Sequence, residues 1–171
     1  MGLASKRPLV ARRVIIGLLT RLARSSEAGM KISTVLATKG NNVVTIRPEL
    51  TLKEAAAWLT KHNIGAMVVT DAAGQMIGIL SERDIVRAAA RHENALTLTV
   101  ADVMTRNVVV GTPQDDVIFV VRTMIARNFR HLPIVEDGQL AGILSIRDVV
   151  KAQLDDYEGA IDQLETQIIE T

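Results

Sequence analysis

The chain has 171 residues, and its 20 Lys and Arg residues against 19 Asp and Glu residues give a net charge of +1. This length forms one domain or two very small ones, which excludes a large catalytic domain beside a second module. Aromatic residues make up 2%, so we expect an aliphatic core and exclude a platform of stacked aromatics for nucleic acid. Cysteine is absent, which excludes disulfides and thiol nucleophiles and suits a reducing compartment. With only three scattered histidines, we expect no metal site.

Residues 1–29 form a basic leader with six Lys and Arg residues against one acidic residue, whereas the remainder has fourteen against eighteen. This acidic body argues against a nucleic-acid partner, because such proteins carry their basic surface on the folded domain. The apolar run at residues 14–19 is too short to span a membrane. Three interpretations of the leader stay open: an extension upstream of a start at Met30, a transit-type presequence, and a basic arm that contacts a membrane or partner. We expect a cytoplasmic protein, or an organelle-targeted one if the leader is a presequence.

Two copies of one unit follow, at residues 30–92 and 93–153. Pro48 recurs as Pro113 and Asn63 recurs as Asn128. The strongest match is the segment Gly-Ile-Leu-Ser-x-Arg-Asp, which ends at Asp84 in the first copy and at Asp148 in the second. An internal repeat determines architecture more firmly than local propensity does.

The first copy predicts a strand, a helix, a hairpin and a second helix, at residues 43–46, 51–63, 66–80 and 81–91. Thr51 and Glu54 stand at the spacing of a capping box, which predicts the start of the first helix. The hairpin consists of apolar strands at residues 66–70 and 75–80 around Asp71-Ala72-Ala73-Gly74.

The second copy predicts the same order, with strands at residues 108–110, 132–135 and 140–144 and helices beginning at Asp116 and Ser145. The expected fold is a mixed α/β one, in which tandem β-α-β-β-α repeats pack sheet against sheet around a pseudo-twofold axis. A crevice between the repeats is the expected ligand site.

A C-terminal helix is expected over residues 154–171. Apolar residues spaced alternately four and three apart lie on one face of it and of the helix before it: Val150, Leu154, Tyr157, Ile161, Leu164 and Ile168. This heptad spacing predicts a packing seam, either against the body of the protein or against a second subunit.

The Ser-x-x-Asp segments at Ser81–Asp84 and Ser145–Asp148 have two interpretations. As a helix start, the hydroxyl caps a backbone N–H and the carboxylate lies favourably in the first turn. As a ligand site, the exposed N–H groups and the hydroxyl suit a phosphate, and the carboxylate suits ribose hydroxyls. The identical flanking Gly-Ile-Leu favours a ligand site, since a cap alone does not constrain it.

These paired units, each ending in Gly, two hydrophobic residues and Ser-x-x-Asp, resemble a CBS domain pair, the regulatory module named after cystathionine β-synthase. The resemblance covers residues 31–153. It implies clefts that bind an adenosyl effector, namely AMP, ADP, ATP, NAD or S-adenosylmethionine, with or without Mg²⁺. It also implies a homodimer and a regulated partner protein that the sequence does not identify.

The resemblance implies roles for particular residues. Asp84 and Asp148 match the ribose-binding aspartates, and Ser81 and Ser145 match the phosphate-side hydroxyls. The remaining candidates are Arg130 and His131 as phosphate ligands, Arg83 and Arg147 as phosphate ligands or ion-pair partners, and Thr45, Ile64, Gly65, Ala66 and Pro133, with Val109–Gly111, as the lining of the clefts. Because residues 64–66 include no basic side chain, we expect two unequal clefts, the more basic one containing Asp148.

The sequence thus predicts a non-catalytic sensor that binds an adenosyl ligand and signals to a partner protein by conformational change. The alternative is a structural dimerisation or scaffold module with vestigial clefts. We expect no enzyme, because the sequence has no P-loop, no nucleophile elbow and no base beside either aspartate.

Overall fold

The computed structural model describes residues 29–169, so the three interpretations of the leader lie outside the described residues. The chain divides into two units, Met1–Met30 and Lys31–Thr171, and the fold described here is that of the second. Two similar repeats make up this unit. Within the described residues, no helix is long and apolar enough to cross a membrane.

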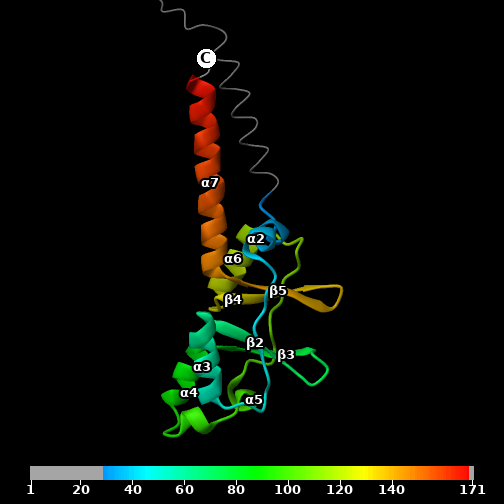
Figure 1. Ribbon diagram of the computed structural model, residues 1–171, viewed down its shortest axis with the longest axis vertical. Coiled ribbons are helices and arrows are strands. Elements are labelled where there is room, and N and C mark those ends of the chain that lie inside the picture. Colours follow the sequence, from blue (N-terminus) through cyan, green and yellow to red (C-terminus); the bar gives the residue numbers. More distant parts are fainter. Residues whose placement is uncertain (1–28, 170–171) are drawn as a thin grey trace, which may run out of the picture. The chain divides into compact units, whose positions relative to one another are not determined.

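The first repeat is a three-stranded sheet with two helices (Figure 1). Its elements are β1 (Thr45–Ile46), α3 (Leu52–His62), β2 (Ala66–Thr70), β3 (Met76–Ser81) and α4 (Glu82–Ala89). Strand β2 pairs parallel with β1 and antiparallel with β3. The predicted capping box is confirmed, since the Thr51 hydroxyl accepts from the Glu54 N–H and the Glu54 carboxylate accepts from the Thr51 N–H. Every residue of β2 is buried, and the predicted bounds of this strand are confirmed.

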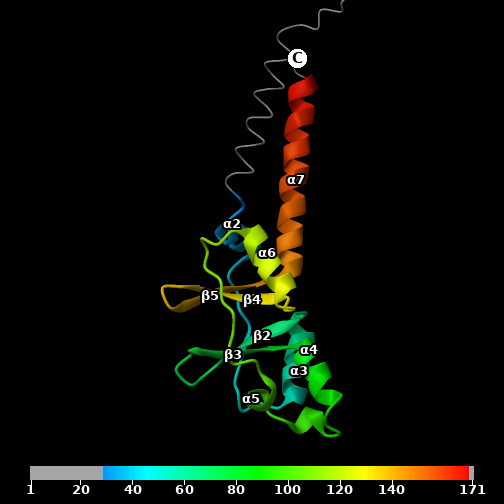
Figure 2. The ribbon, with the colours of Figure 1, turned by 180° about the vertical axis from the view of Figure 1, so that it is seen from behind.

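The second repeat has the same helices and hairpin but a two-stranded sheet. Its elements are α6 (Val117–Ala126), β4 (His131–Glu136), β5 (Gln139–Ser145) and α7 (Ile146–Ile169). Asp116 caps α6 as predicted, accepting from the N–H groups of Ile118 and Phe119. The β4–β5 hairpin lies next to the β2–β3 hairpin in both views (Figures 1 and 2).

The predicted strand at residues 108–110 is wrong, and Pro133 explains the difference. Only Gly111 bridges to β4, donating its N–H to the Pro133 carbonyl and accepting from the Val135 N–H. In the first repeat, Val68 stands where Pro133 stands and pairs with Thr45 of β1. Proline has no N–H to donate, so the preceding rung of the ladder is lost in the second repeat.

Two helices that the sequence analysis did not predict, α2 (Ile32–Lys39) and α5 (Val100–Val103), cross from one repeat to the other. A Cβ on Gly78 of β3 would lie 2.7 Å from Met104 Sδ, directly after α5. Likewise a Cβ on Gly142 of β5 would lie 2.8 Å from Leu36 Cδ2 on α2. The β-hairpin of each repeat therefore packs against the helical segment at the start of the other repeat. A 3₁₀ turn, η1 (Ala95–Thr97), completes the connection between the repeats.

Helix α7 continues without a break through the segment predicted as a C-terminal helix. Val150, Leu154, Tyr157 and Ile161 form an exposed apolar stripe on it. The side chains of Leu164 and Ile168 lie outside the described residues. The described part of the seam therefore does not pack on the body of its own chain.

Candidate functional site

A cavity of about 380 Å³ lies between the two repeats. This volume falls within the range of ~300–1,000 Å³ typical of small-molecule sites. The first repeat contributes Gly65, Ile79, Ser81, Glu82, Arg83, Asp84 and Arg87; the connection and the second repeat contribute Thr105, Asn107, Val108, Val109, Arg127, Asn128, Phe129, Arg130 and His131. We call this cavity the first cleft. A ligand held in it would touch both repeats.

Asp84 is placed by the start of helix α4. Its Oδ2 atom accepts from the Ser81 N–H at 2.9 Å and from the Ser81 hydroxyl at 2.6 Å. Within residues 29–169, Asp84 forms no ion pair and its hydrogen bonds all end on Oδ2, so Oδ1 remains available as an acceptor. The helix-cap interpretation and the ligand interpretation of Ser81 and Asp84 are therefore compatible.

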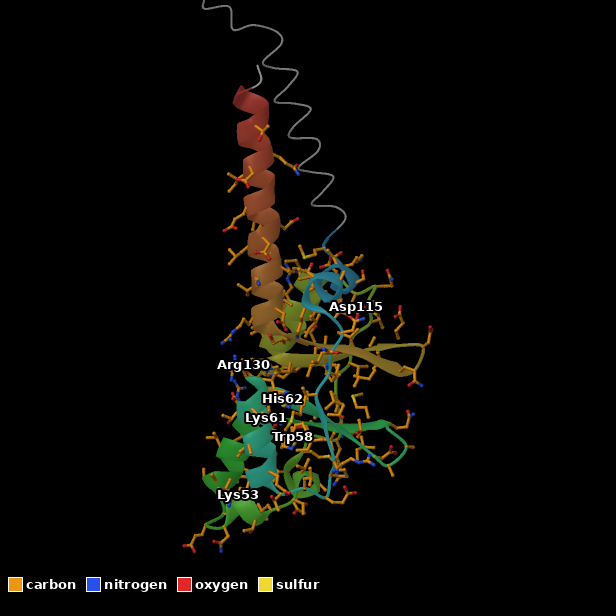
Figure 3. All side chains as sticks on the ribbon, in the orientation of Figure 1. Lys53, Trp58, Lys61, His62, Asp115 and Arg130 are labelled. Carbon is orange, nitrogen blue, oxygen red and sulfur yellow. The ribbon has the colours of Figure 1, made fainter. Side chains whose placement is uncertain are left out.

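The wall of the first cleft opposite Asp84 comes from the segment between α6 and β4. Arg83 reaches across and donates to the Asn128 carbonyl at 2.9 Å, joining the two repeats. Asn128 has a φ of 57°, the left-handed conformation that asparagine tolerates at the end of a helix. Figure 3 shows Arg130 where the two repeats meet. The cleft thus contains four arginines against the two carboxylates of Glu82 and Asp84.

His131 is half-buried at the start of β4 and packs against Gly65. A Cβ on Gly65 would lie 3.0 Å from both Cε1 and Nε2 of the His131 ring. Burial lowers the pKa of His131, and the charge of Arg130 lowers it further, while the Asp148 carboxylate opposes them. The ring is therefore neutral near pH 7, when one nitrogen donates and the other accepts.

Asp148 has a similar cap but a different partner. Its Oδ2 atom accepts from the Ser145 N–H at 2.7 Å and from the Ser145 hydroxyl at 2.8 Å. The same oxygen also pairs with the Lys39 ammonium group, which in addition donates to the Ile143 carbonyl at 2.7 Å. We call this place, beside Ser145 and Asp148, the second cleft, because it is the counterpart in the second repeat of the place beside Ser81 and Asp84.

The structure separates the predicted site residues into two sets. Seven line the first cleft: Gly65, Ser81, Arg83, Asp84, Val109, Arg130 and His131. Nine do not: Thr45, Ile64, Ala66, Val110, Gly111, Pro133, Ser145, Arg147 and Asp148. Arg130 and His131 line the first cleft together with Asp84, while the Asp148 carboxylate also acts on the pKa of His131. The expectation that Arg130 and His131 share a cleft with Asp148 stays a prediction. Arg147 is exposed and lies outside the first cleft.

Several lining residues escaped the sequence analysis, notably Arg87, Arg127, Thr105 and Asn107. Arg87 lies one helical turn after Arg83, so the helix period would have placed both on one face of α4. Arg127 directly precedes the repeated Asn128, and Asn107 is itself a repeated position. Thr105 gave no signal, because it enters the site through the crossing of α5 onto the first repeat.

The comparison with known families decides what this arrangement is. The CBS domain family matches residues 33–91 and 100–155, which are the two repeats. The chain belongs to the CBS domain family. The CBS-domain-containing protein ATU1752 from Agrobacterium tumefaciens is 43% identical, with a TM-score of 0.71 over 74% of this chain and 94% of that one. The predicted fold class, a mixed α/β pair of repeats, is therefore confirmed.

Two further CBS structures contain adenosyl ligands. The CBS domain protein PAE2072 from Pyrobaculum aerophilum, complexed with AMP, is 29% identical with a TM-score of 0.62, over 70% of this chain and 89% of that one. The CBS domain pair of MJ0100, in complex with 5′-methylthioadenosine and S-adenosylmethionine, is 26% identical with a TM-score of 0.66, over 75% of this chain and 98% of that one. CBS pairs related to this chain thus bind adenosyl compounds.

The described part of the chain contains no group of three or more His, Asp or Glu side chains that could hold a metal ion.

Proposed function

We propose that this CBS pair is a non-catalytic sensor that binds an adenosyl ligand in the first cleft and transmits binding to a partner protein. The observation that carries the proposal is the meeting of Asp84 with four arginines in one cavity of about 380 Å³ between the repeats. A carboxylate oxygen suits two ribose hydroxyls, and arginine is well suited to phosphate. The related structures with AMP and with S-adenosylmethionine support the same ligand class.

The assignment of roles follows from position. Asp84 Oδ1 takes the ribose hydroxyls, and the arginines together with His131 take the phosphate side. Val108 and Val109 line the same cavity and supply apolar surface for the adenine ring. Ser81 holds Asp84 in place through two hydrogen bonds.

Signalling requires that the ligand binds two conformations with different affinity. The first cleft meets this requirement in principle, because its walls come from both repeats and the Arg83–Asn128 hydrogen bond crosses between them. A ligand that contacts both walls favours one spacing of the two repeats. A partner protein that binds this spacing with higher affinity then responds to the ligand.

The test is thermal unfolding of the full chain with AMP, ADP, ATP, NADH or S-adenosylmethionine, each with and without Mg²⁺. A ligand at 100 times its Kd stabilises by about 2.7 kcal/mol, which for this chain length raises Tm by roughly 5–11 °C. Asp84→Asn should abolish most of this shift. Asp102→Asn is the matched control, because Asp102 completes the same kind of capping box with Thr99 outside the cleft.

A shift that survives Asp84→Asn would place the ligand elsewhere and overturn the assigned site. No shift with any member of the panel, in folded protein, would favour the alternative of a scaffold module with vestigial clefts.

We also propose that the protein is a homodimer that uses the α7 stripe. The side chains of Val150, Leu154, Tyr157 and Ile161 are each 49–64% exposed and follow heptad spacing. Sedimentation should give twice the chain mass, and Leu154→Asp should give the chain mass. Lys151→Asp adds the same side chain outside the stripe and should leave the dimer intact, whereas a monomeric starting protein would contradict the proposal.

We keep the cytoplasm as the proposed location. The basic leader supplies the competing hypothesis of an organelle. Imaging of the full chain and of residues 30–171, each fused at its C-terminus to a fluorescent protein, distinguishes the two: a cytoplasmic full chain supports the proposal, and an organellar one that becomes cytoplasmic on truncation contradicts it.

A further inference from the structure

The two clefts are related by the repeat, but different groups hydrogen-bond to the strand beside each of them. At the first cleft, the chain after α5 pairs with β3, since the Thr105 N–H donates to the Ile79 carbonyl at 2.9 Å. Ile143 of β5 is the counterpart of Ile79, one residue after the matching glycine. Its carbonyl accepts from the Lys39 side chain at 2.7 Å. A lysine side chain thus replaces a backbone bridge.

The same ammonium group pairs with Asp148 Oδ2, the counterpart of the oxygen that Ser81 binds in the first cleft. Asp148 Oδ2 therefore has three donors, from the Ser145 N–H, the Ser145 hydroxyl and Lys39. Asp84 Oδ2 has two, both from Ser81. The difference between the two aspartates is one cation.

The position of Lys39 is set by the fold. Lys39 is the last residue of α2, and Gly40 ends the helix with a φ of 88°. Leu36, one turn earlier, packs against Gly142 of β5, which brings the end of α2 over the second repeat. A cation in the last turn also suits the negative end of the helix dipole. Lys39 and Asp148 are 31% and 22% exposed, so solvent screens this ion pair less than one on the open surface.

We propose that Lys39 is a tethered occupant of the second cleft: its ammonium group pairs with the Asp148 carboxylate through Oδ2 and lies where a ribose would approach that carboxylate, so the chain binds an adenosyl ligand in the first cleft alone. The proposal rests on the proposed function, because it assumes that an aspartate of this motif binds ribose. It adds that the chain's own Lys39 occupies the carboxylate that corresponds to Asp84 of the first cleft.

Two physical considerations support this occupancy. A side chain attached to the same chain competes at a high effective concentration, which a free ligand must exceed. A ligand that reached Asp148 would also leave the Lys39 ammonium without its carboxylate partner, which costs free energy in a partly buried place.

The charge state of Asp148 agrees with the geometry. Burial alone would raise the pKa of this carboxyl, but the hydrogen bonds from Lys39 and Ser145 lower it below the ordinary value. The carboxylate is therefore ionised and bound by its own chain at neutral pH.

The experiment is isothermal titration of the full chain with AMP and, separately, with 5′-methylthioadenosine, which lacks phosphate. We expect one ligand per chain for the natural protein and two for Lys39→Met. Lys53→Met is the matched control, because Lys53 is exposed on α3, and it should keep one ligand (Figure 3). Lys39→Arg retains the positive charge and should also keep one.

Double variants assign the sites. Asp148→Asn added to Lys39→Met should remove the new site, so that only the first cleft binds ligand. Asp84→Asn added to Lys39→Met should remove binding in the first cleft, so that only the new site binds ligand. Two ligands on the natural protein, or one on Lys39→Met, would overturn the role of Lys39 while the proposed function stands. No binding by any of these proteins would overturn both, whereas binding by Lys39→Met but not by the natural protein would overturn only first-cleft binding.

A fall in folding stability does not hide the result. Circular dichroism of Lys39→Met reports the folded fraction, and Lys39→Gln, which retains a donor for the Ile143 carbonyl without the charge, provides a second variant with the same expected gain of one site.

Discussion

The first and second clefts begin from one motif and differ in what faces it. Both aspartates accept hydrogen bonds from the serine three residues before them, with donor–acceptor distances of 2.6–2.9 Å. Asp84 shares a cavity with four arginines, two on its own helix α4 and two from the second repeat, whereas Asp148 is paired with Lys39. A duplicated motif therefore does not duplicate a site, because the opposite wall comes from the other half of the molecule.

The two repeats also differ in the size of the side chains where they meet, at Gly65 and His131. Near a pseudo-twofold axis, equivalent side chains approach one another and cannot both be large. The first repeat has Gly65 and Ala66 where the second has Arg130 and His131, and the His131 ring occupies the space that Gly65 leaves. Asymmetry at this junction makes room for the basic side chains.

The largest expected difference between the clefts is in ligand affinity. Asp84→Asn should weaken binding of AMP about 100-fold, because each hydrogen bond to a charged group contributes ~1.5–3 kcal/mol and each ~1.4 kcal/mol is a factor of ten. Asp148→Asn should change the affinity less than about threefold. Titration calorimetry measures both, and equal losses would break the comparison.

Substitution of the two interface glycines should destabilise the repeats unequally. The Cβ of Gly78→Ala meets Met104 at 2.7 Å and the Thr105 carbonyl at 3.0 Å, and the backbone atom cannot move aside. The three atoms nearest to the Cβ of Gly142→Ala all belong to the Leu36 side chain, which can rotate. From the cost of overpacking, we expect the free energy of unfolding to fall by about 2–3 kcal/mol for the first and about 1 kcal/mol for the second. Urea unfolding measures both losses. A larger loss for Gly142→Ala than for Gly78→Ala would contradict the packing argument.

A pH titration should distinguish the clefts through His131. Burial and Arg130 lower the pKa of His131, and a ligand phosphate beside the ring would raise it. The bound state then holds more protons, so affinity for AMP should rise as pH falls from 8 to 6, by up to about tenfold for each unit of pKa shift. Because the phosphate also titrates, the measured quantity is the difference between the natural protein and His131→Asn. An unchanged pH profile in His131→Asn would remove His131 from the phosphate site.

The smallest effect concerns the ion pair at the second cleft. The lowered pKa of Asp148 means that its contribution to stability is present above the unfolded value near 3.8 and is lost as pH falls through the lower folded value. Lys39→Met should reduce this acid-dependent part of stability by about 1 kcal/mol or less. Urea unfolding at pH 6 and pH 3 measures it, with Lys53→Met as the control. A loss of equal size at both pH values would mean that the Lys39 contribution is packing rather than charge.

Much of the fold was predictable because its signals are local. The bounds of β2, the capping box at Thr51 and the cap at Asp116 follow from residues within four positions of each other. The prediction of a strand at residues 108–110 was wrong for a reason that is not local, because the N–H needed to pair with it is absent from Pro133 on the neighbouring strand. Helices α2 and α5 lie inside the predicted bounds of the repeats but before the first predicted strand of each, in segments for which no element was predicted.

The sequence by itself determined the repeat, the elements and the two Ser-x-x-Asp helix starts, because capping and hydrophobic periodicity act over a few residues. Only the tertiary structure decided that Arg130 and His131 line one cavity with Asp84 and that Lys39 pairs with Asp148. The contacts that join distant parts of the chain include the hydrogen bond from Arg83 to Asn128, 45 positions apart, and the one from Lys39 to Asp148, 109 positions apart. Their formation depends on the crossing of α2 and α5 between the repeats, which no local pattern encodes.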